Sequence, residues 1–433
     1  MQSFLKYAIV TILTWEARAV LWRYKPKIIA VTGSAGKTST KDAIYATLSG
    51  AGLSVRKSQK NLNSKVGVPL AILARENAWW NVWAWIKNIA YGLYIIIIKT
   101  PFPEWLVLEV GADRPGDIRR VARWLKPDIA VITSIPDIPV HVEFFHSADE
   151  LAKEKRQLAA HLGREGKLIL NGDDERTVAI HNEFRHLATT FGFGGQNNFN
   201  ASHDEITYEG KKPVGVQFRA NRSGSSVPVF LHGVLGRPAI YAALAALAVA
   251  EALEVDMIRA AEALKKWVPP AGRMRILDGI KGSIIIDDTY NSSPVAALSA
   301  LETLINIPSV KKRMAVLGDM LELGKYSTEE HKKIGKFAAE YADNLVTVGF
   351  RARAIAESAM DNGMSEKKVR QYEQNEARRA GKELESELGE GVVVLVKGSQ
   401  SMRMERAVKE IMAEPERAAE LLSRQEGEWL QKT

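Results

Sequence analysis

A glycine-rich segment that directly follows an apolar run constrains the fold of this chain more than any other feature. The run, residues 28–31, is rich in β-branched side chains, and a helix-forming stretch, residues 41–48, comes after the segment. A strand, a tight glycine turn and a helix in this order are typical of a phosphate-binding loop, because the turn lets backbone N–H groups close around phosphate oxygens. The segment itself reads Thr32-Gly33-Ser34-Ala35-Gly36-Lys37-Thr38-Ser39.

Two side chains of this segment carry the chemistry of such a loop. Lys37 supplies a point charge for the β- and γ-phosphates of a nucleotide, and the Thr38 hydroxyl suits Mg²⁺. Val31 stands where the commoner form of the motif has its first glycine, so the match is to the shorter Thr-Gly-Ser-x-Gly-Lys-Thr form. The sequence therefore predicts a P-loop that follows a strand and precedes a helix.

Composition narrows the class of protein further. A length of 433 residues predicts two or three domains, and the absence of cysteine excludes disulfides, thiolate metal sites and cysteine nucleophiles. It also agrees with a reducing, cytoplasmic compartment. A net charge of +8 suits a polyanion or an anionic membrane, but lysine and arginine are scattered along the chain. Without a dense basic run interleaved with aromatics, we expect no nucleic-acid partner.

The first of two apolar stretches covers residues 4–24. Charged side chains interrupt it at Lys6, Glu16, Arg18 and Arg23, and a bilayer centre tolerates them poorly. Apolar side chains recur there at helical spacing, namely at Leu5, Ile9, Ile12, Trp15, Ala19 and Trp22. We therefore predict an amphipathic helix over residues 1–26, either packed on the protein or lying at a membrane interface.

The second apolar stretch, residues 78–98, holds four tryptophans and a run of isoleucines. Its length is enough to span a bilayer, but Asn81, Lys87, Asn88 and Gly92 weaken that interpretation. The stretch also lies between the phosphate loop and another expected active-site strand, so that spanning would split a domain. Burial or peripheral contact with a membrane is the favoured interpretation.

Strand-like runs alternate with helical patterns from residue 27 onward, which favours an α/β fold with parallel sheets. We expect a central P-loop ATPase domain over residues 27–270, with strands near 28–31, 105–110, 129–133 and 167–170. Antiparallel strands are expected over 206–217 and 227–231, with turn residues at Glu209-Gly210 and Ser223-Gly224.

The proline- and glycine-containing break at residues 267–272 is the best candidate for a hinge. The alternation restarts beyond it, with strands expected near 283–287, 314–317, 345–348 and 392–396. This pattern predicts a Rossmann-like, doubly wound C-terminal domain over residues 271–433. The charged tail from residue 414 is expected to form helix with a solvated face.

Three further residues are candidates for the chemistry of the site. Glu109 ends an apolar strand, where α/β sheets bind ligands, and a carboxylate beside a phosphate loop suits Mg²⁺. His141 follows the next strand and, in company with Thr38 and Glu109, is a candidate second metal ligand. Lys155 lies in a charged helical run, which by itself predicts only a solvated face.

The order of several motifs resembles the Mur ligase family of ATP-dependent amide-forming enzymes, from residue 27 to about residue 405. Besides the phosphate loop, the motifs are Asn61-Leu62-Asn63, Glu109-Val110-Gly111, Asn171-Gly172-Asp173-Asp174, Gly272-Arg273-Met274, Asp287-Asp288-Thr289-Tyr290-Asn291, Met320-Leu321-Glu322-Leu323-Gly324 and Val396-Lys397-Gly398-Ser399. The last three, in this order, are most similar to the branch that adds D-Ala-D-Ala to UDP-N-acetylmuramoyl-tripeptide in peptidoglycan precursor synthesis. The resemblance implies these two substrates and ATP, and we expect a monomer.

The resemblance also implies roles for particular residues. Lys37 and the loop amides would hold the ATP phosphates, while Thr38, Glu109 and His141 would serve two Mg²⁺ sites. Lys155 falls where the family carries a carbamylated lysine, whose carbamate helps to ligate the second Mg²⁺. A lysine converted in this way becomes an anion, which a two-metal site favours electrostatically.

The remaining implied contacts involve the substrates and the nucleotide. Arg273 would reach the transferred phosphate from the hinge, and Asp288 would contact the ribose, with Asn291 in the same nucleotide-binding segment. Asn61 and Asn63 would face the peptide substrate. Family members of this branch usually carry a separate N-terminal domain for the UDP-sugar, and about 26 residues precede the first strand here. How the UDP-sugar is held therefore stays open.

Two alternatives stay open as well. One is a Mur-type or folylpolyglutamate-synthase-like ligase that joins a different carboxylate and amine. The other is a membrane-associated nucleotide-binding scaffold without turnover, which the N-terminal helix and the tryptophan-rich stretch motivate. Peripheral contact with the inner face of the membrane is compatible with either enzyme or scaffold.

Overall fold

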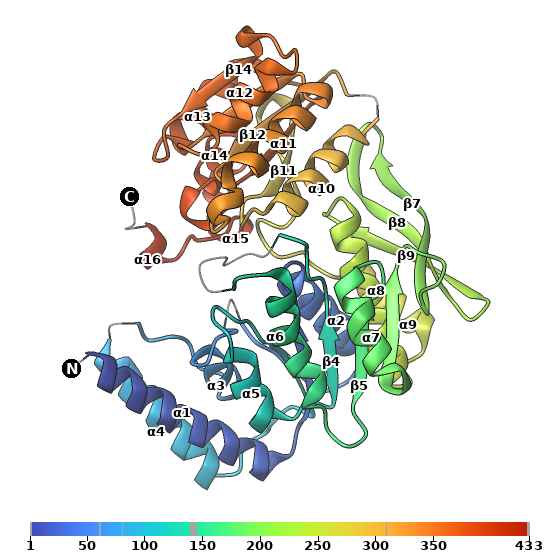
Figure 1. The fold of residues 1–433 in the computed structure, drawn as a ribbon, viewed down its shortest axis with the longest axis vertical. Helices are drawn as coiled ribbons and strands as arrows, with labels where there is room; N and C mark the ends of the chain where they lie inside the picture. The colour runs from blue at the N-terminus through green and yellow to red at the C-terminus, as the bar shows by residue number, and fades with distance from the viewer. Residues whose placement is uncertain (1, 60–61, 80, 139–144, 309, 431–433) are drawn as a thin grey trace.

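The computed structural model describes residues 2–59, 62–79, 81–138, 145–308 and 310–430. Within these residues two β-sheets lie one above the other, and helices cover both (Figure 1). The first sheet has nine strands in the order β2-β3-β1-β4-β5-β6-β7-β8-β9, and the second has six in the order β10-β11-β15-β12-β13-β14. The α/β fold class that the sequence predicts is confirmed.

Parallel pairing dominates the first sheet, and the P-loop strand β1 (Lys27–Thr32) lies between β3 (Trp105–Glu109) and β4 (Ile129–Ile132). The other strands on the parallel side are β2 (Val55–Lys57), β5 (Lys167–Asn171), β6 (Ala188–Gly192) and β7 (Phe199–Glu209). The antiparallel part of this sheet consists of β7, β8 (Lys212–Arg222) and β9 (Ser225–His232), and it turns at Gly210 and Gly224 as predicted.

Alternate residues of β1 face opposite helical layers, because successive side chains of a strand point to opposite sides. Ile29 and Val31 pack in one cluster, with α2 (Lys37–Gly50), α8 (Arg237–Ala252) and α9 (Met257–Lys265). Ile28 and Ala30 pack in the other, with α3 (Gly67–Ile72), α5 (Asp117–Leu125), α6 (Ala148–Ala160) and α7 (Glu175–Glu183). Both faces are covered, so a ligand can reach this sheet only at the strand ends.

The second sheet is doubly wound, as predicted. Its parallel strands are β11 (Ile284–Asp288), β15 (Val392–Lys397), β12 (Lys312–Gly318), β13 (Asn344–Val348) and β14 (Val369–Tyr372), and β10 (Arg275–Asp278) joins one edge antiparallel. Helices α10 (Pro294–Ile305), α11 (Ser327–Tyr341) and α12 (Arg353–Asp361) cover one face, and α13 (Ala377–Leu384) and α14 (Glu405–Ile411) cover the other. Edge strands β10 and β14 were missed, because each is four residues long and has at most two apolar residues in a row.

Helix α1 (Gln2–Tyr24) forms where a helix was predicted, but the expected apolar stripe is not the one that packs. Three side chains of that stripe, Ile12, Trp15 and Trp22, are exposed. The buried side carries Leu13, Ala17 and Val20 together with Glu16. Helical spacing alone could not separate the two sides, because both are apolar. The side chain of Leu5 lies outside the described residues.

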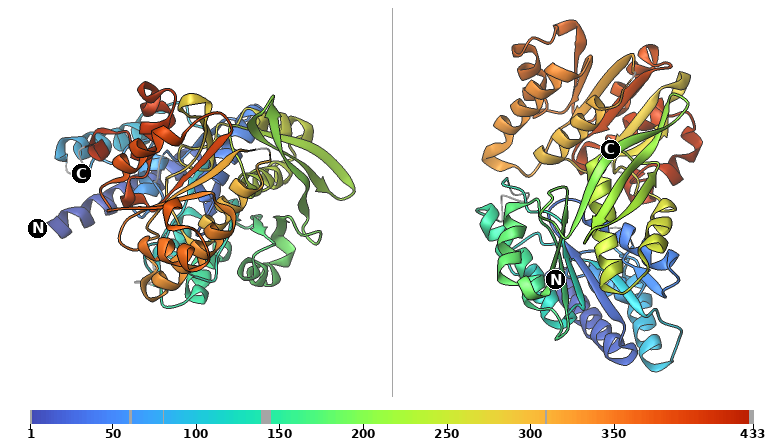
Figure 2. Two further views of the ribbon diagram at one scale, coloured as in Figure 1. Left: turned by 90° about the horizontal axis from the view of Figure 1, so that it is seen from above. Right: turned by 90° about the vertical axis from the view of Figure 1, so that its right-hand side faces the viewer.

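Helix α4 (Val82–Ile97) occupies most of the second apolar stretch and lies beside α1, at the end of the molecule away from the second sheet (Figures 1 and 2). Helix α4 is neither buried in the core nor a membrane-spanning helix. Its buried residues are Asn88, Gly92 and Ile95, and most of its large apolar side chains are exposed. In the part of the chain that the structure describes, no helix is long and apolar enough to cross a membrane.

The C-terminal tail corrects another expectation. The tail includes α15 (Ala418–Leu421) and the short α16 (Gly427–Leu430). Instead of presenting only a solvated face, it buries Leu421, Leu422 and Arg424 against the second sheet domain. The charged composition of residues 414–433 concealed this packing, because the buried side chains are interspersed with exposed glutamates and arginines.

Candidate active site

The P-loop has the backbone geometry that its glycines predict. Gly33 and Gly36 have φ angles of 144° and 79°, which L side chains rarely adopt. A Cβ atom at Gly33 would lie 1.9 Å from Thr133 Oγ1, so the loop also approaches the end of β4 too closely for any side chain. The Ser34 N–H donates to the Ser134 carbonyl over 2.8 Å and ties the loop to the same segment.

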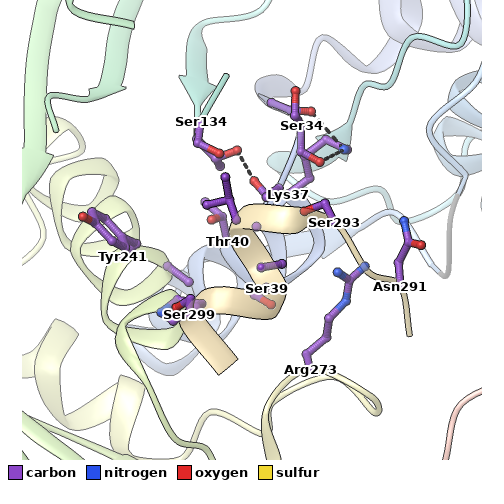
Figure 3. A pocket seen from close by; sticks show the side chains of 18 of the residues that line it. Ser34, Lys37, Ser39, Thr40, Ser134, Tyr241, Arg273, Asn291, Ser293 and Ser299 are labelled. Atoms are coloured by element: carbon purple, nitrogen blue, oxygen red, sulfur yellow. Dashed lines mark hydrogen bonds between the residues drawn. The ribbon is translucent and has the colours of Figure 1, made fainter. Parts of the chain in front are cut away.

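The Lys37 ammonium lies within this loop and faces the cavity (Figure 3). Its Nζ donates to the carbonyl oxygens of Gly33, over 2.9 Å, and Ser34, over 3.3 Å. Burial lowers the pKa of Lys37, and the nearby Glu109 carboxylate opposes that shift. The side chain is therefore held by weak neutral acceptors, which an anionic phosphate group can replace.

Behind the loop, Glu109 connects two candidate site residues. Thr38 donates from Oγ1 to Glu109 Oε2 over 3.0 Å, and Asn63 donates from Nδ2 to Glu109 Oε1 over the same distance. Glu109 itself is 2% exposed, at the end of β3. A hydroxyl and a carboxylate at hydrogen-bond distance are a suitable start for an Mg²⁺ site, because this cation takes oxygen ligands.

The solvated position that the residue pattern alone predicts for Lys155 is wrong. Lys155 is 3% exposed and its side chain lines the cavity. Its neighbour Glu154 accepts hydrogen bonds from the backbone N–H groups of Gly116 and Ile118, over 2.8 and 2.6 Å, which fixes α6 against the start of α5. Burial, and then the positive charge of Lys37, lower the pKa of Lys155 to about 7.

Arg273 comes from the segment that leads into the second sheet, and two carboxylates at the end of β11 fix its backbone. The Gly272 N–H donates to Asp287 Oδ2 over 3.0 Å, and the Met274 N–H donates to Asp288 Oδ1 over 3.2 Å. Both residues that flank Arg273 are thus anchored. The consecutive aspartates of this motif therefore set the direction of Arg273.

Aromatic contact completes the support of Arg273. Its guanidinium carbon lies 4.1 Å from the ring centre of Tyr290, a distance typical of a cation–π contact. Arg424 of the C-terminal tail lies 4.9 Å from the same ring centre, and its Nη1 donates to the Thr289 carbonyl over 3.1 Å. The tail therefore holds the loop on which Arg273 rests.

A cavity of about 440 Å³ separates the P-loop from these residues of the second sheet. Figure 3 shows Arg273 and Asn291 across it from the loop. Eleven of the predicted site residues line it: Gly33, Ser34, Ala35, Gly36, Lys37, Ser39, Asn63, Lys155, Arg273, Asp288 and Asn291. Thr38 and Glu109 lie behind the lining. Asn61 and His141 lie outside the described residues.

Sequence reasoning assigned no role to one wall of this cavity. Asp173, which follows β5, accepts hydrogen bonds from the Tyr241 hydroxyl over 2.9 Å and from Asn197 Nδ2 over 2.7 Å. The Tyr241 and Phe193 rings meet edge to face, with 5.1 Å between their centres. Burial, and then the charge of Asp173, raise the pKa of Tyr241, so it stays a neutral donor. The Asn-Gly-Asp-Asp motif after the strand was the available signal.

The residues present fit a metal ion bound together with phosphate oxygens rather than by protein ligands alone. Among the described residues, no three histidine, aspartate or glutamate side chains gather as a metal-binding group. The Thr38 hydroxyl and the Glu109 carboxylate provide two oxygens beside the loop. Mg²⁺ is commonly held by one or two carboxylates plus substrate phosphates, and this donor set is of that kind.

The fold and the site together define a class of nucleotide-binding ligases, and comparison with known families agrees. The family model for the Mur ligase middle domain matches residues 98–250, and the model for the Mur ligase, glutamate ligase domain matches residues 272–400. The chain belongs to the Mur ligase family. The resemblance that the motifs indicated is confirmed.

Individual relatives narrow the similarity to one branch. The UDP-N-acetylmuramoyl-tripeptide–D-alanyl-D-alanine ligase of Bacillus subtilis (strain 168) is 29% identical, over 94% of this chain and 80% of the relative. The ligase of the same name from Escherichia coli (strain K12) is 27% identical, over 88% and 76%. The structure of MurF ligase from Thermotoga maritima in complex with ADP gives a TM-score of 0.75 at 26% identity, over 93% of this chain and 83% of that one.

Proposed function

We propose that this protein is an ATP-dependent ligase that joins D-Ala-D-Ala to UDP-N-acetylmuramoyl-tripeptide in peptidoglycan precursor synthesis. The observation that carries the proposal is the cavity that places Lys37 and Lys155 opposite Arg273 and Lys397. Four lysine or arginine side chains therefore surround one cavity, and Lys155 is the one that carbamylation would make anionic. Such a cavity suits a reaction that moves a phosphoryl group between anions. The names of the relatives support the choice of the two substrates.

The proposed chemistry begins with a carboxylate, which is a poor acyl donor. The γ-phosphoryl group of ATP passes to the substrate carboxylate and gives an acyl phosphate. The amine of D-Ala-D-Ala attacks its carbonyl carbon, loses a proton, and phosphate leaves. Lys37 and the loop N–H groups of Gly33 to Ser39 hold the nucleotide phosphates, and Arg273 contacts the transferred group. Asp288 and Asn291 contact the nucleotide, and Asn61 and Asn63 face the peptide.

Two Mg²⁺ ions belong to the proposal. Thr38, Glu109 and His141 would serve the metal sites, and a carbamate on Lys155 would help to hold the second ion. Bound Mg²⁺ supplies charge neutralisation at the phosphate oxygens. Carbamylation needs a neutral lysine, and the pKa of Lys155, lowered to about 7 by burial, supports it.

We also propose a division of the chain and a location. A division into residues 1–26, 27–270 and 271–433 keeps each sheet within one part. The turn at 267–272 would then act as the hinge whose closure excludes water from the acyl phosphate. The proposed location is the cytoplasm, at the inner face of the membrane. The exposed aromatic side chains of α1 and α4 support the contact with the membrane.

Phosphate release tests the proposed reaction. The intact protein is incubated with ATP, Mg²⁺ and bicarbonate, and the two substrates are supplied singly and together. We expect release only when both are present, together with a product whose mass equals the two substrates minus water. Formation of that product distinguishes ligation from idle hydrolysis of ATP.

Two outcomes would overturn the substrate assignment. ATP binding without release, even with both substrates, would support the scaffold. Release with a folate and glutamate instead would support the folylpolyglutamate-synthase-like alternative. A folylpolyglutamate synthase from Mycobacterium tuberculosis complexed with ADP has the same fold, with a TM-score of 0.63 at 14% identity. The experiment therefore includes a folate and glutamate as a separate substrate pair.

A further inference from the structure

Helix α4 differs from an ordinary surface helix, because most of its large apolar side chains are exposed although Ile95 is buried. An ordinary surface helix buries its apolar stripe and exposes its polar one. Here Asn88 and Gly92 are buried, and Asn88 is fixed by Arg75 Nε and the Glu76 carbonyl, both 2.9 Å away. The exposed side instead holds aromatic and aliphatic residues, and Trp83 and Ile97 are 75% and 70% exposed.

Helix α1, which contacts α4, also has exposed apolar side chains. Its Trp15 and Trp22 are 57% and 80% exposed, although Leu13, Ala17 and Val20 pack inward. The two helices contact each other, and the Tyr24 hydroxyl at the end of α1 donates to the Ile95 carbonyl of α4 over 2.9 Å. Together they form a paired unit, the α1–α4 surface, defined by the exposed residues of α1 and of residues 79–99.

Close packing makes this pair a rigid unit. Gly92 lies against Glu16, and a Cβ atom at Gly92 would come within 2.3 Å of Glu16 Oε2. The Glu16 side chain is fully buried between the helices. Burial raises the pKa of Glu16 to about 7, so the carboxyl group is only partly ionised at neutral pH.

Within residues 7–25 and 78–100, the exposed charged side chains have one sign. Residues 78–100 contain no aspartate or glutamate, and Glu16 is the only acidic residue of 7–25. The exposed cations are Arg18, Arg23, Lys25, Lys87 and Lys99. A surface that is aromatic, aliphatic and flanked by lysine and arginine is complementary to an anionic lipid headgroup layer above an acyl core.

We propose that the α1–α4 surface binds the protein peripherally to an anionic lipid bilayer. Trp15, Trp22 and Trp83 insert at the level of the headgroups, and the flanking cations contact lipid phosphates. Protein interfaces also favour tryptophan and arginine, but they are depleted in lysine, which flanks this surface at three positions. No helix among the described residues is apolar and long enough to span, so the contact is interfacial.

The position of the surface leaves the active site free. α1 and α4 lie at the end of the molecule opposite the second sheet, as Figures 1 and 2 show. The cavity lies between the two sheets, and its lining includes no residue of α1 or α4. Bilayer binding and turnover of soluble substrates are therefore separate properties, and the proposal stands independently of the proposed ligase reaction.

Vesicle sedimentation and tryptophan quenching test the proposal. The intact protein is mixed with vesicles of phosphatidylcholine alone or with one third phosphatidylglycerol, and brominated acyl chains report insertion. We expect at least tenfold tighter binding to the anionic vesicles, weakened by salt, with quenching of fluorescence. The double variant W22S/W83S should bind at least tenfold more weakly and lose most of the quenching. R18E/K87E should lose the preference for phosphatidylglycerol.

A matched control separates insertion from general hydrophobicity. Phe350 is 71% exposed at the other end of the molecule, so F350S should bind vesicles like the unaltered chain. Because all substituted side chains are exposed, each variant should keep its melting temperature and its ATP-binding affinity. The proposal is overturned if W22S/W83S and the unaltered protein bind equally. It is also overturned if the protein ignores both vesicles and instead forms a dimer that W22S/W83S dissociates.

Discussion

Lys397 donates from Nζ to Asp288 Oδ2 over 2.5 Å, and the same two residues are direct partners in the parallel register of β11 and β15. Lys397 Nζ also donates to the Asn291 carbonyl over 2.9 Å. The lysine side chain is 2% exposed. The aspartate that the family resemblance assigns to the ribose is thus held in a buried ion pair at the ends of two neighbouring strands.

Replacing Lys397 by methionine should destabilise the protein by about 3–5 kcal/mol, because it leaves the buried Asp288 carboxylate without its partner. The double variant D288N/K397M should cost less than the two single variants added together, since neither charge is then left alone. Denaturant unfolding followed by circular dichroism measures both quantities. Strict additivity would mean that the two side chains do not stabilise each other.

Replacing Lys37 by alanine should lower ATP-dependent phosphate release by about 100-fold or more, because the point charge on the β- and γ-phosphates is lost. The melting temperature should change little, since in the described part of the chain the Lys37 ammonium donates to two loop carbonyls and to no other group. K336A, at an exposed position of α11, is the matched control and should retain activity. Equal rates for K37A and K336A would remove Lys37 from the proposed mechanism.

The Lys155 hypothesis predicts a dependence on pH and on bicarbonate. Below about pH 7 the side chain is protonated and cannot form a carbamate, so activity should fall as the pH decreases from 8 to 6. K155R, which keeps a charge but cannot be carbamylated, should lose about 100-fold in rate. A carbamate carbon signal from ¹³C-labelled bicarbonate should be present in the unaltered protein and absent from K155R. The same signal in both proteins would contradict the assignment.

Glu16 should make the protein less stable at high pH. Burial raises its pKa in the folded state to about 7, above the unfolded value, so ionisation disfavours the folded state as the pH rises from about 5 through 7. In the described part of the chain, neither carboxylate oxygen has a hydrogen-bond partner. E16Q should therefore raise the melting temperature by roughly 2 °C or more at pH 8 and change it little at pH 5. E104Q, at an exposed position, should show no such difference.

Arg424 should affect turnover although it does not line the cavity. It supports the Thr289–Tyr290 backbone and lies against the ring on which Arg273 rests. R424M should lower the kcat of phosphate release by about tenfold with a smaller effect on the KM for ATP, since the loop loosens while the P-loop is untouched. R417M, which removes an exposed arginine of the same tail, is the control. A matching loss in R417M would indicate a general effect on the tail.

Local sequence accounted for the elements that depend on neighbouring residues. The P-loop conformation follows from Gly33 and Gly36, which accept positive φ angles. The hairpin turns at Gly210 and Gly224 follow in the same way, and the apolar runs located β1, β3, β4 and β5 within one or two residues. Edge strand β14 was missed because its sequence, Val-Arg-Gln-Tyr, contains no apolar run.

The sequence by itself determined the phosphate loop, the two-sheet α/β architecture and the family motifs, because each depends on short-range backbone preferences and on apolar periodicity. Only the tertiary structure decided that Lys155 is buried, that Lys397 pairs with Asp288 across 109 residues, and that Arg424 reaches back to Tyr290. It also decided which sides of α1 and α4 face solvent. Burial and pairing between distant segments depend on how whole elements pack, and the spacing of residues along one helix or strand does not contain that information.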